Sequence, residues 1–532
     1  VQKWNGLVLF CFQFDQEGGK FIYNSANYHQ MKLVKRIGLV LLTLLLLAPI
    51  IGYFGMRYEV KLHSGTFTEV LDPSTFVDSY KTIGIKNVNV LSSDSSYFQL
   101  RNIVLSDGEI QSVDSVSIID PGIEYMDGRN QFLIPGLIDT HVHLLDSKND
   151  LYLYIANGVT SVCEMFGTTK HLKWSKAAKN GAISPNLYVS TSKVASQKGL
   201  PSKIEKYFGG GLHYTSPKAA RAAVQQFKQA GYDAVKLSSN LNLEIYQAII
   251  EEAEKQDIPV IGHLSHKIGL ENLYSSGQSE LAHVEEITKS TMVDFNGYVS
   301  EKPEEYLEYL SARADSIAIK LKESEIAVST TVWLMESLPR QRFELEQFLK
   351  TIEVEYVNPG ILEGSNMVGG WLPGSNEYEN PDSESDTEQA RVYWNTYAEA
   401  VRIMTKALAD HGVTLLVGTD ANVTGVVPGF SLHDEMQSLS GMGLSNAEVL
   451  TAATLEPAEF MQIKTGTIRP GYKSDLVLLS KNPLEDIRYT QAIEHVFFGD
   501  HMMDKEQIQE ILNAIKEINS LERNLDIKSH LQ

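Results

Sequence analysis

The stretch Leu133-Ile134-Pro135-Gly136-Leu137-Ile138-Asp139-Thr140-His141-Val142-His143 decides the fold prediction. It is an apolar run of strand length that ends in two histidines at positions i and i+2. Side chains at that spacing lie on the same side of a strand, so at a strand end they can chelate one metal ion. A lone His-x-His is weak evidence, but the preceding apolar strand, the Pro-Gly pair and Asp139 strengthen the prediction of a metal site.

Downstream of this stretch, short apolar runs alternate with helical patterns. Helices are predicted over 217–230 and 243–255, and strands over 158–162, 187–190, 234–237, 259–262, 326–330 and 413–417. Repeated strand–helix alternation indicates a parallel sheet, either closed as a barrel or open and doubly wound. No Gly-rich phosphate loop follows the early strands, which weakens the open, dinucleotide-binding alternative. We therefore predict an α/β fold with a TIM-type (β/α)8 barrel over residues 135–462.

Short strands and turns precede and follow the predicted barrel. The first group occupies residues 63–134, with strands expected over 85–90, 102–105, 115–119 and 122–126, and β character returns at 476–479 within 463–503. A charged amphipathic helix is predicted in the tail, 504–532. Residues 355–395, rich in Gly, Asn, Ser, Pro and Glu, are predicted to form a long loop before the last barrel strand, and loops of that length are usually functional or disordered.

Residues 1–62 have the pattern of a targeting segment. Lys32, Lys35 and Arg36 precede an apolar run over 37–56 that contains no charged residue until Arg57. At 1.5 Å per residue this run is roughly 30 Å long, the thickness of one bilayer core. The preceding positive charge favours a cytoplasmic N-terminus. No small-x-small cleavage site follows, which favours an uncleaved signal-anchor over a cleaved signal peptide. The catalytic part is then expected outside the cytoplasm, either membrane-anchored or secreted.

Composition narrows the class of partner. The chain has 532 residues, enough for a large barrel and an accessory domain, and its net charge is −21, with 67 acidic and 46 basic residues. Nucleic acid is disfavoured because phosphate backbones need a basic face. The only two cysteines, Cys11 and Cys163, exclude a disulfide framework and a cysteine-based zinc site. We expect a small-molecule substrate, and the sequence leaves a homo-oligomer open.

Further candidate ligands stand at the ends of later predicted strands: Lys236, His263, His283 and Asp420. In a TIM-type barrel those strand ends converge on one face. A free ammonium cannot bind a cation, but Lys236 carbamylated by CO₂ becomes an anionic ligand that can bridge two metals; the alternative is a lysine that forms a salt bridge or binds substrate. Asp420 can bind a metal and accept a proton from water, whereas His266 is expected in a loop. Imidazole and carboxylate ligands without thiolate suit Zn²⁺, with Mn²⁺ or Co²⁺ as alternatives.

The order of these motifs resembles the amidohydrolase superfamily, specifically its imidazolonepropionase-like and Xaa-Pro dipeptidase-like branch. The resemblance rests on the motifs at 135–143, 233–236, 261–263, 282–285, 418–421, 450–458 and 466–477. It implies that the β segments before and after the barrel form one small β-sandwich, built from both ends of the catalytic chain. One departure is Glu164, which stands where relatives often have Asp and puts in question only detail around the metal ligands.

The resemblance also implies the role of each candidate residue. His141 and His143 bind the more buried of two divalent ions together with Asp420, a carbamate on Lys236 bridges the ions, and His263 and His283 bind the second ion. Asp420 is in addition the general base. The implied reaction is hydrolysis of an amide-type C–N bond, in a dipeptide or an N-acyl amino acid, by a metal-bridging hydroxide.

Three alternatives to this function remain at the level of the sequence. A cyclic-amide hydrolase or deaminase would use one metal, and Lys236 argues against it. A phosphotriesterase or lactonase could use the same pair of ions. A non-catalytic binding protein is disfavoured because such barrels usually lose ligands and all six positions are filled. Substrate specificity is expected in the rim loops, where Tyr207, His213, Trp333 and Trp371 are pocket candidates.

Overall fold

The computed structural model describes residues 25–200, 202, 211–365, 368–374 and 384–531, so Cys11 and Tyr207 lie outside the described residues. The chain separates into two compact units, Val1–Glu59 and Val60–Gln532. Helix α1 (Ser25–His63) makes up the described part of the first unit and continues into the second. From Lys32 it is long and apolar enough to cross a membrane, properties that a signal sequence shares. The predicted N-terminal apolar helix is therefore confirmed, and its membrane topology stays a prediction.

Short parallel strands form the centre of the second unit: β7 (Leu137–Val142), β8 (Val159–Glu164), β9 (Asn186–Val189), β12 (Val235–Leu237), β13 (Val260–Gly262), β14 (Glu280–Ala282), β15 (Ala327–Ser329) and β16 (Leu415–Leu416). They pair in the groups β7-β8-β9, β12-β13 and β14-β15-β16. Backbone contacts link these groups in turn: a bridge between Ser190 and Ala234, a 2.8 Å hydrogen bond from Ser279 N to Val260 O, and a bridge between Val142 and Ala421. This succession is consistent with a TIM barrel.

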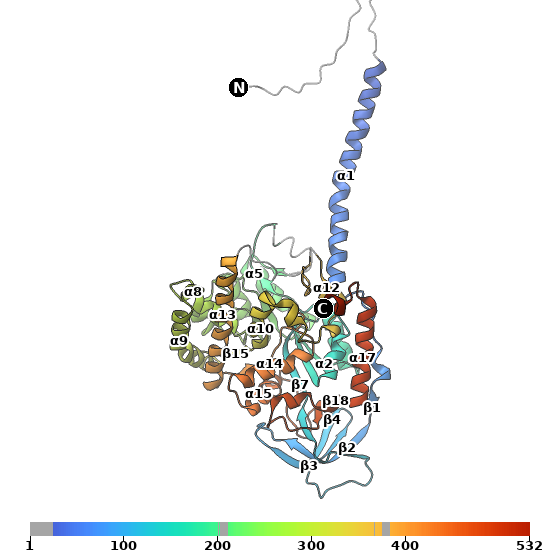
Figure 1. Cartoon of the computed structure of the whole chain (residues 1–532), viewed down its shortest axis with the longest axis vertical. Coiled ribbons are helices and arrows are strands. Elements are labelled where there is room, and N and C mark those ends of the chain that lie inside the picture. Colours follow the sequence, from blue (N-terminus) through green and yellow to red (C-terminus); the bar gives the residue numbers. More distant parts are fainter. Residues whose placement is uncertain (1–24, 201, 203–210, 366–367, 375–383, 532) are drawn as a thin grey trace, which may run out of the picture. The chain divides into compact units, whose positions relative to one another are not determined.

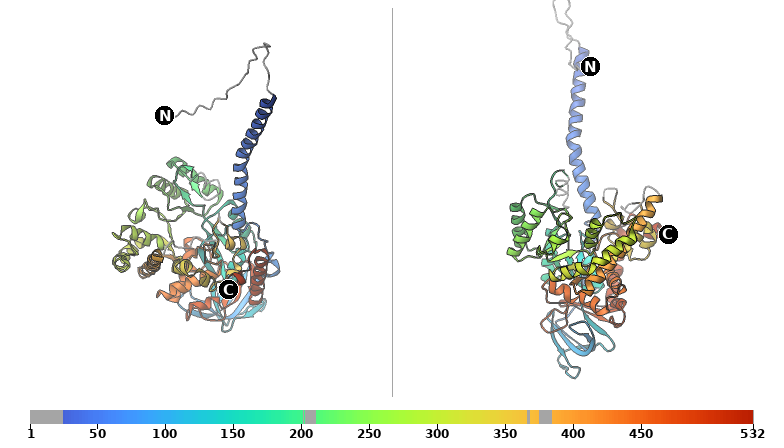
Figure 2. Two further views of the ribbon diagram at one scale, coloured as in Figure 1. Left: turned by 45° about the horizontal axis from the view of Figure 1, so that its top comes forward. Right: turned by 90° about the vertical axis from the view of Figure 1, so that its left-hand side faces the viewer.

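Helices follow the strands and lie around them (Figures 1 and 2). They are α2 (Asp150–Ala156), α3 (Thr169–Lys179), α5 (Pro217–Ala230), α6 (Leu243–Gln256), α7 (Gly269–Leu273), α8 (Glu285–Asp294), α9 (Pro303–Glu323), α10 (Val332–Phe343), α11 (Leu345–Leu349), α12 (Pro359–Glu363), α13 (Glu384–Asp410), α14 (Phe430–Gly441), α15 (Asn446–Ala452) and α16 (Leu455–Phe460). Helix α5 shows how local sequence sets their ends. The Ser216 hydroxyl accepts a hydrogen bond from Ala219 N, and Gly231 ends the helix at φ 89°. These bounds agree with the predicted helix.

A second sheet combines strands from before and after the barrel, in the order β1-β19-β18-β17-β6-β2-β3-β4, with β5 beside β2. Its members are β1 (Asp78–Ser79), β2 (Thr82–Leu91), β3 (Phe98–Ser106), β4 (Glu109–Asp114), β5 (Tyr125–Asp127), β6 (Phe132–Pro135), β17 (Leu476–Leu479), β18 (Ile493–Phe498) and β19 (His501–Asp504). Strands β6 and β17 pair antiparallel, and Leu133 and Leu476 share one apolar core with Ile103 and Phe497. Both ends of the catalytic chain therefore build this sheet. Its closure as a sandwich, and the boundaries 63–134, 135–462 and 463–503, stay predictions.

Two local predictions were wrong. Residues 115–119 do not form a strand: Ile118 and Ile119 are more than half exposed, and the Asn102 amide donates to the carbonyls of Val116 and Ile118. The apolar residues that alternate there have no neighbouring surface to pack against. The loop expected over 355–395 also contains α12, and α13 begins at Glu384. Helix α13 forms because apolar residues recur at helical spacing and are buried, among them Tyr397, Val401, Met404 and Leu408.

The predicted tail helix is confirmed as α17 (Lys505–Glu522). The Asp504 side chain accepts from Gln507 N, while the Gln507 side chain accepts from Asp504 N in a capping box. Short α18 (Ile527–His530) follows, and its Ile527 packs into an apolar cluster with Phe348 and Leu362. The tail is thus a packed part of the second unit.

Candidate metal centre

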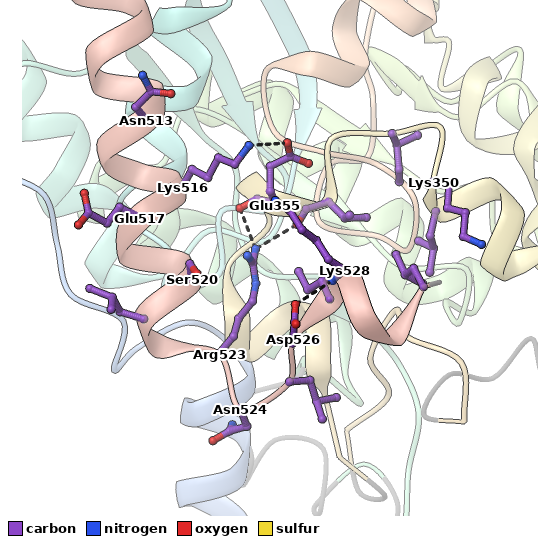
Figure 3. Close-up of a pocket in the computed structure, with 17 residues that line it drawn as sticks. Lys350, Glu355, Asn513, Lys516, Glu517, Ser520, Arg523, Asn524, Asp526 and Lys528 are labelled. Carbon is purple, nitrogen blue, oxygen red and sulfur yellow. Dashed lines mark hydrogen bonds and ion pairs between the residues drawn. The ribbon is translucent and has the colours of Figure 1, made fainter.

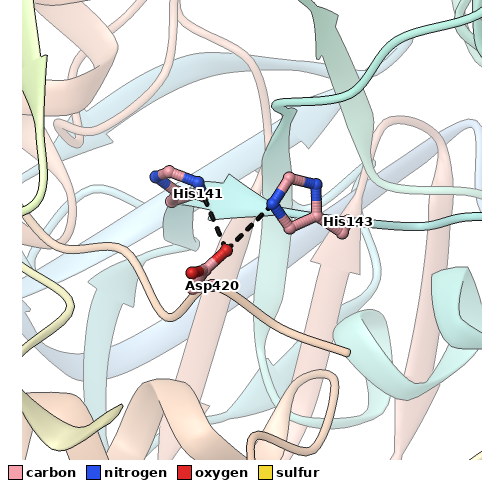
Figure 4. Close-up of side chains that lie close together, drawn as sticks. All are labelled: His141, His143 and Asp420. Carbon is pink, nitrogen blue, oxygen red and sulfur yellow. Dashed lines mark ion pairs between the residues drawn. The ribbon is translucent and has the colours of Figure 1, made fainter. Parts of the chain in front are cut away.

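His141 lies on β7, whose residues are all buried, and His143 directly follows this strand, next to the loop that follows β16. Asp420 in that loop is held against β7 by a 2.8 Å hydrogen bond from its backbone N to His141 O. Its Oδ1 atom lies 3.3 Å from His141 Nε2 and 2.9 Å from His143 Nε2 (Figure 4). Two ring nitrogens and a carboxylate oxygen therefore face one point, with the three atoms within 4.8 Å of one another.

The other three predicted residues lie beside this group. Lys236 is fully buried on β12, with Nζ 3.1 Å from His141 Nε2. His283 directly follows β14, and its ring centroid is 4.4 Å from that of His141. His263 directly follows β13, with its ring centroid 5.1 Å from that of His283. The structure thus brings all six residues together at the carboxyl ends of their strands, whereas His266 is exposed.

Partners at the second ring nitrogen orient two of the imidazoles. His263 Nδ1 lies 3.0 Å from Glu286 Oε1, and His283 Nδ1 lies 2.9 Å from Thr331 Oγ1. These contacts leave Nε2 of each ring for a ligand. Metal-binding histidines are commonly held in this way, with the nitrogen that does not bind the metal hydrogen-bonded to a neighbouring oxygen.

Burial sets the charge of the centre. It lowers the pKa of His283 to about 4 and lowers the pKa values of His141 and His263 well below the ordinary range, so these rings are neutral at pH 7. It also lowers the pKa of Lys236 to about 8, against the opposing effect of the Asp420 carboxylate. Burial alone would raise the pKa of Asp420, but the imidazoles beside it hold that pKa well below the usual range. Neutral imidazole and ionised carboxylate are the forms that bind metals.

Backbone conformation at three positions is uncommon for residues with a side chain. His283, Thr331 and Asp420 have φ values of 73°, 49° and 64°, in the left-handed region. Such conformations persist only where the surrounding structure fixes them, and they cluster at functional sites. Here they lie at two candidate ligands and at the partner of one of them.

Buried carboxylates hold the loops that carry the ligands. Asp139 accepts hydrogen bonds from Thr419 Oγ1 (2.7 Å), Thr419 N (3.0 Å) and His141 N (3.2 Å), which ties β7 to the loop of Asp420. Glu164 accepts from Leu144 N at 2.6 Å, just after His143, and from Phe166 N at 2.7 Å. Glu164 thus supports the backbone next to a ligand and stands outside the cluster of ring nitrogens.

The donor set fits divalent cations. Asp420 Oδ1 and His141 Nδ1 are buried and have no hydrogen-bond partner among the described residues. The donor set consists of four imidazoles, the Asp420 carboxylate and the buried Lys236 amine, and it contains no thiolate. A cation between Asp420 Oδ1 and the two nearby Nε2 atoms would supply the partner that Asp420 Oδ1 lacks, and this chemistry suits Zn²⁺ or a similar ion.

Two residues that orient histidines were not predicted from the sequence. Glu286 follows the 282–285 motif by one position, and Thr331 ends the segment after β15. Spacing gives no signal for either, because each contacts a histidine of the neighbouring strand–helix repeat. Of the pocket candidates, Trp371 is 2% exposed within an apolar cluster, Trp333 is partly buried against Phe348, and His213 ends β11 (Leu212–His213).

Comparison with known proteins relates the sequence of this chain to hydrolases. The sequence profile of the amidohydrolase family matches residues 132–503, which include all six residues. The dihydroorotase of Solibacter usitatus is 25% identical over 193 residues, 34% of this chain and 41% of the relative. The chain therefore matches less than half the length of that relative.

Solved structures share the fold. Bottromycin amidohydrolase superposes with a TM-score of 0.65 at 19% identity, over 88% of this chain and 97% of that chain. A Xaa-Pro dipeptidase with bound methionine superposes with a TM-score of 0.55 at 16% identity, over 80% of this chain and all of that chain. At these identities the likeness extends to the fold and no further.

Proposed function

The chain belongs to the amidohydrolase family, hydrolases that act on carbon–nitrogen bonds, and we propose that it uses two divalent cations to cleave an amide-type bond in a dipeptide or an N-acyl amino acid. The observation that carries the proposal is the meeting of six candidate ligands at one face. His141, His143 and Asp420 would hold one ion, and His263 and His283 the second. Zn²⁺ is the favoured ion, with Mn²⁺ or Co²⁺ as alternatives.

Lys236 is proposed to bridge the two ions as its carbamate. Its buried amine lies against His141 Nε2, and its lowered pKa favours the neutral form that reacts with CO₂. Because burial disfavours a free ammonium more than the nearby Asp420 carboxylate favours it, conversion to an anionic ligand fits the surroundings of Lys236. The N-terminal apolar helix is proposed to anchor the enzyme in a membrane, with the catalytic unit outside the cytoplasm.

The chemistry divides between the ions and the side chains. Bound divalent cations lower the pKa of water and polarise the scissile carbonyl. Asp420 would accept the proton of the attacking water and return it to the leaving nitrogen, because its lowered pKa keeps the carboxylate ionised and able to take up a proton. Asp139 keeps the loop of Asp420 in place against β7 during both transfers.

The proposal is tested by screening purified, Zn²⁺-supplied full chain against dipeptides, N-acyl amino acids, cyclic amides, lactones and phosphoesters. We expect hydrolysis of an amide substrate, and Asp420→Asn should lower kcat by about 10² to 10⁴ while the fold is kept. Unchanged turnover in Asp420→Asn would remove Asp420 as the base. Hydrolysis of lactones or phosphoesters alone would overturn the amide assignment.

A cyclic-amide hydrolase is the second candidate. It is favoured by the similarity to a dihydroorotase, whose name denotes a cyclic-amide substrate. Cyclic amides in the screen decide between the two, because a linear dipeptide and a ring amide differ in the leaving group that Asp420 must protonate.

A further inference from the structure

The inference concerns the surface where the chain joins the catalytic unit, and it rests on the membrane anchoring proposed above. The second unit begins at Val60, four residues after the apolar run ends at Met56. At no more than about 3.6 Å per residue, those four residues reach about 14 Å. A bilayer that contains the apolar run therefore lies within a short distance of the surface around Val60.

Helix α12 connects this junction to the C-terminal tail. His63 Nδ1 lies 2.9 Å from Gly360 O, and the Thr68 hydroxyl donates to Asn358 Oδ1 at 3.2 Å. At the other end of α12, the Glu363 carboxylate accepts from the Asn524 backbone N at 2.7 Å. We call residues 63–70, α12 and 521–525 together the junction surface.

Apolar side chains are exposed on the junction surface. Phe67 is 50% exposed, Val70 48%, Leu521 78% and Leu525 44%. Isolated exposed apolar residues are ordinary, but several that gather beside one junction indicate an interaction site.

A cavity of about 1120 Å³ opens beside the same residues, between the tail and the segment after α11 (Figure 3). Its apolar lining includes Leu349, Ile352, Val354, Leu521, Leu525 and Leu531. Its charged lining is four basic residues, Lys350, Lys516, Arg523 and Lys528, and three acidic ones, Glu355, Glu517 and Asp526. The whole chain, by contrast, has 46 basic and 67 acidic residues, so the cavity lacks the acidic excess of the rest of the protein.

One hydrogen-bond donor of a residue that lines the cavity has no partner among the described residues. Arg523 Nη2 donates to the carbonyls of Val354, Glu355 and Val357 at 3.1, 2.7 and 3.1 Å. Its Nε is buried and has no hydrogen-bond partner among the described residues. Lys516 is paired with Glu355 at 3.0 Å, and the Asp526 carboxylate accepts from the Lys528 backbone N at 3.1 Å (Figure 3). No ion pair joins the Lys528 ammonium to another described side chain.

We propose that the junction surface rests on the bilayer and that its cavity binds an anionic phospholipid, with acyl chain against the leucines and headgroup beside Lys528 and Arg523. Exposed apolar residues beside basic side chains such as Lys528 and Arg523 are what an anionic bilayer surface attracts. The contact fixes which face of the catalytic unit meets the membrane.

Co-sedimentation alone cannot test this, because the apolar helix would carry any attached unit to vesicles. The test uses the full chain with Cys11→Ser, in which Cys163 is 3% exposed and therefore protected from labelling. A fluorophore is attached at Leu521→Cys, or at the control Leu100→Cys, which is 48% exposed on β3 of the second sheet. The probes are phosphatidylcholine vesicles with brominated acyl chains, with and without phosphatidylglycerol.

We expect quenching at position 521, stronger with phosphatidylglycerol, and little quenching at position 100. Lys528→Ala should reduce the phosphatidylglycerol dependence at position 521 by about fivefold, the effect of one basic charge near an anionic bilayer. Equal, weak quenching at both positions in vesicle-bound protein would overturn the lipid surface while anchoring stands. Protein that does not bind vesicles at all would overturn both proposals. Hydrolysis of soluble amides by the same preparations tests the proposed catalytic activity separately, because this activity does not depend on vesicle binding.

Discussion

Single residues fix the direction of each imidazole in the centre. Glu286 Oε1 and Thr331 Oγ1 contact the Nδ1 atoms of His263 and His283, so only Nε2 of each ring is free to bind an ion. Both partners are buried, at 3% and 0% exposure. Loss of either partner therefore leaves a neutral ring free to rotate or to change tautomer.

Replacement of Glu286 tests this orientation. Glu286→Ala should weaken retention of the second metal about 10- to 100-fold, because the tautomer of His263 is no longer fixed. Glu286→Gln keeps an oxygen acceptor and should lose less. The measurement is metal content after dialysis against graded chelator. The matched control is Glu271→Gln, whose side chain is 80% exposed and remote from the histidines, and a loss as large in that control would refute the role of Glu286.

At the scale of single residues, the sequence predicted which side chains come together but not the residues that orient them. His141, His143, Lys236, His263, His283 and Asp420 each end an apolar run, so strand geometry alone brings them to one face. Glu286 and Thr331 have no such signal, because their contacts depend on the packing of neighbouring repeats. The identity and number of the ions stay predictions.

The loop after β16 packs closely against the strands that carry the candidate metal ligands. Gly418 packs so closely that an added Cβ would lie 2.7 Å from Ser329 Oγ and 2.8 Å from His141 Cβ. Gly418→Ala should therefore destabilise the protein by about 1–3 kcal/mol and lower activity without changing a ligand. Melting temperature and kcat together check this. Gly441→Ala is the control, since its Cβ would meet nothing within 4 Å, and equal effects at both positions would contradict the account.

A buried carboxyl between α2 and the loop of Asp420 should make the stability of the protein depend on pH. Asp150 is buried, accepts from Ser147 Oγ at 2.6 Å and Asn422 Nδ2 at 2.8 Å, and burial raises its pKa to about 7. The folded state thus favours the protonated acid. Its contribution to stability is full below the unfolded pKa of about 4 and is lost as pH rises through 7.

Asp150→Asn should remove this dependence because the amide stays neutral. The variant should gain stability relative to the native chain between pH 4 and 7, by up to about 4 kcal/mol, the equivalent of three pKa units. Melting temperatures of both proteins across that range give the difference. A difference that stays constant with pH would show that Asp150 is ionised throughout.

Element prediction succeeded where burial follows periodicity and failed where it does not. Helix α5 and strand β17 match their predicted bounds because α5 buries one face of a helical pattern and β17 is a short apolar run that is buried throughout. Residues 115–119 have the alternation of a strand but lie exposed after β4. Composition suggested a loop over 355–395, yet α13 begins at Glu384 and buries an apolar stripe from Tyr397 to Leu408.

The whole molecule depends on contacts between distant parts of the chain. Pairing of β6 with β17 joins residues 132–135 to 476–479, and periodicity cannot predict such pairing. The resemblance to known hydrolases supplied that expectation. For the N-terminal unit, sequence and structure agree on one long apolar helix.

The central claim is that His141, His143, Lys236, His263, His283 and Asp420 together hold two cations. Metal content per chain, measured by elemental analysis on purified full chain and on Lys236→Ala, tests it most directly. The account predicts about two ions per native chain and a fall toward one in the variant, since the bridging carbamate is lost. A native chain that retains no divalent metal, or a variant that holds two as tightly as the native chain, would contradict it.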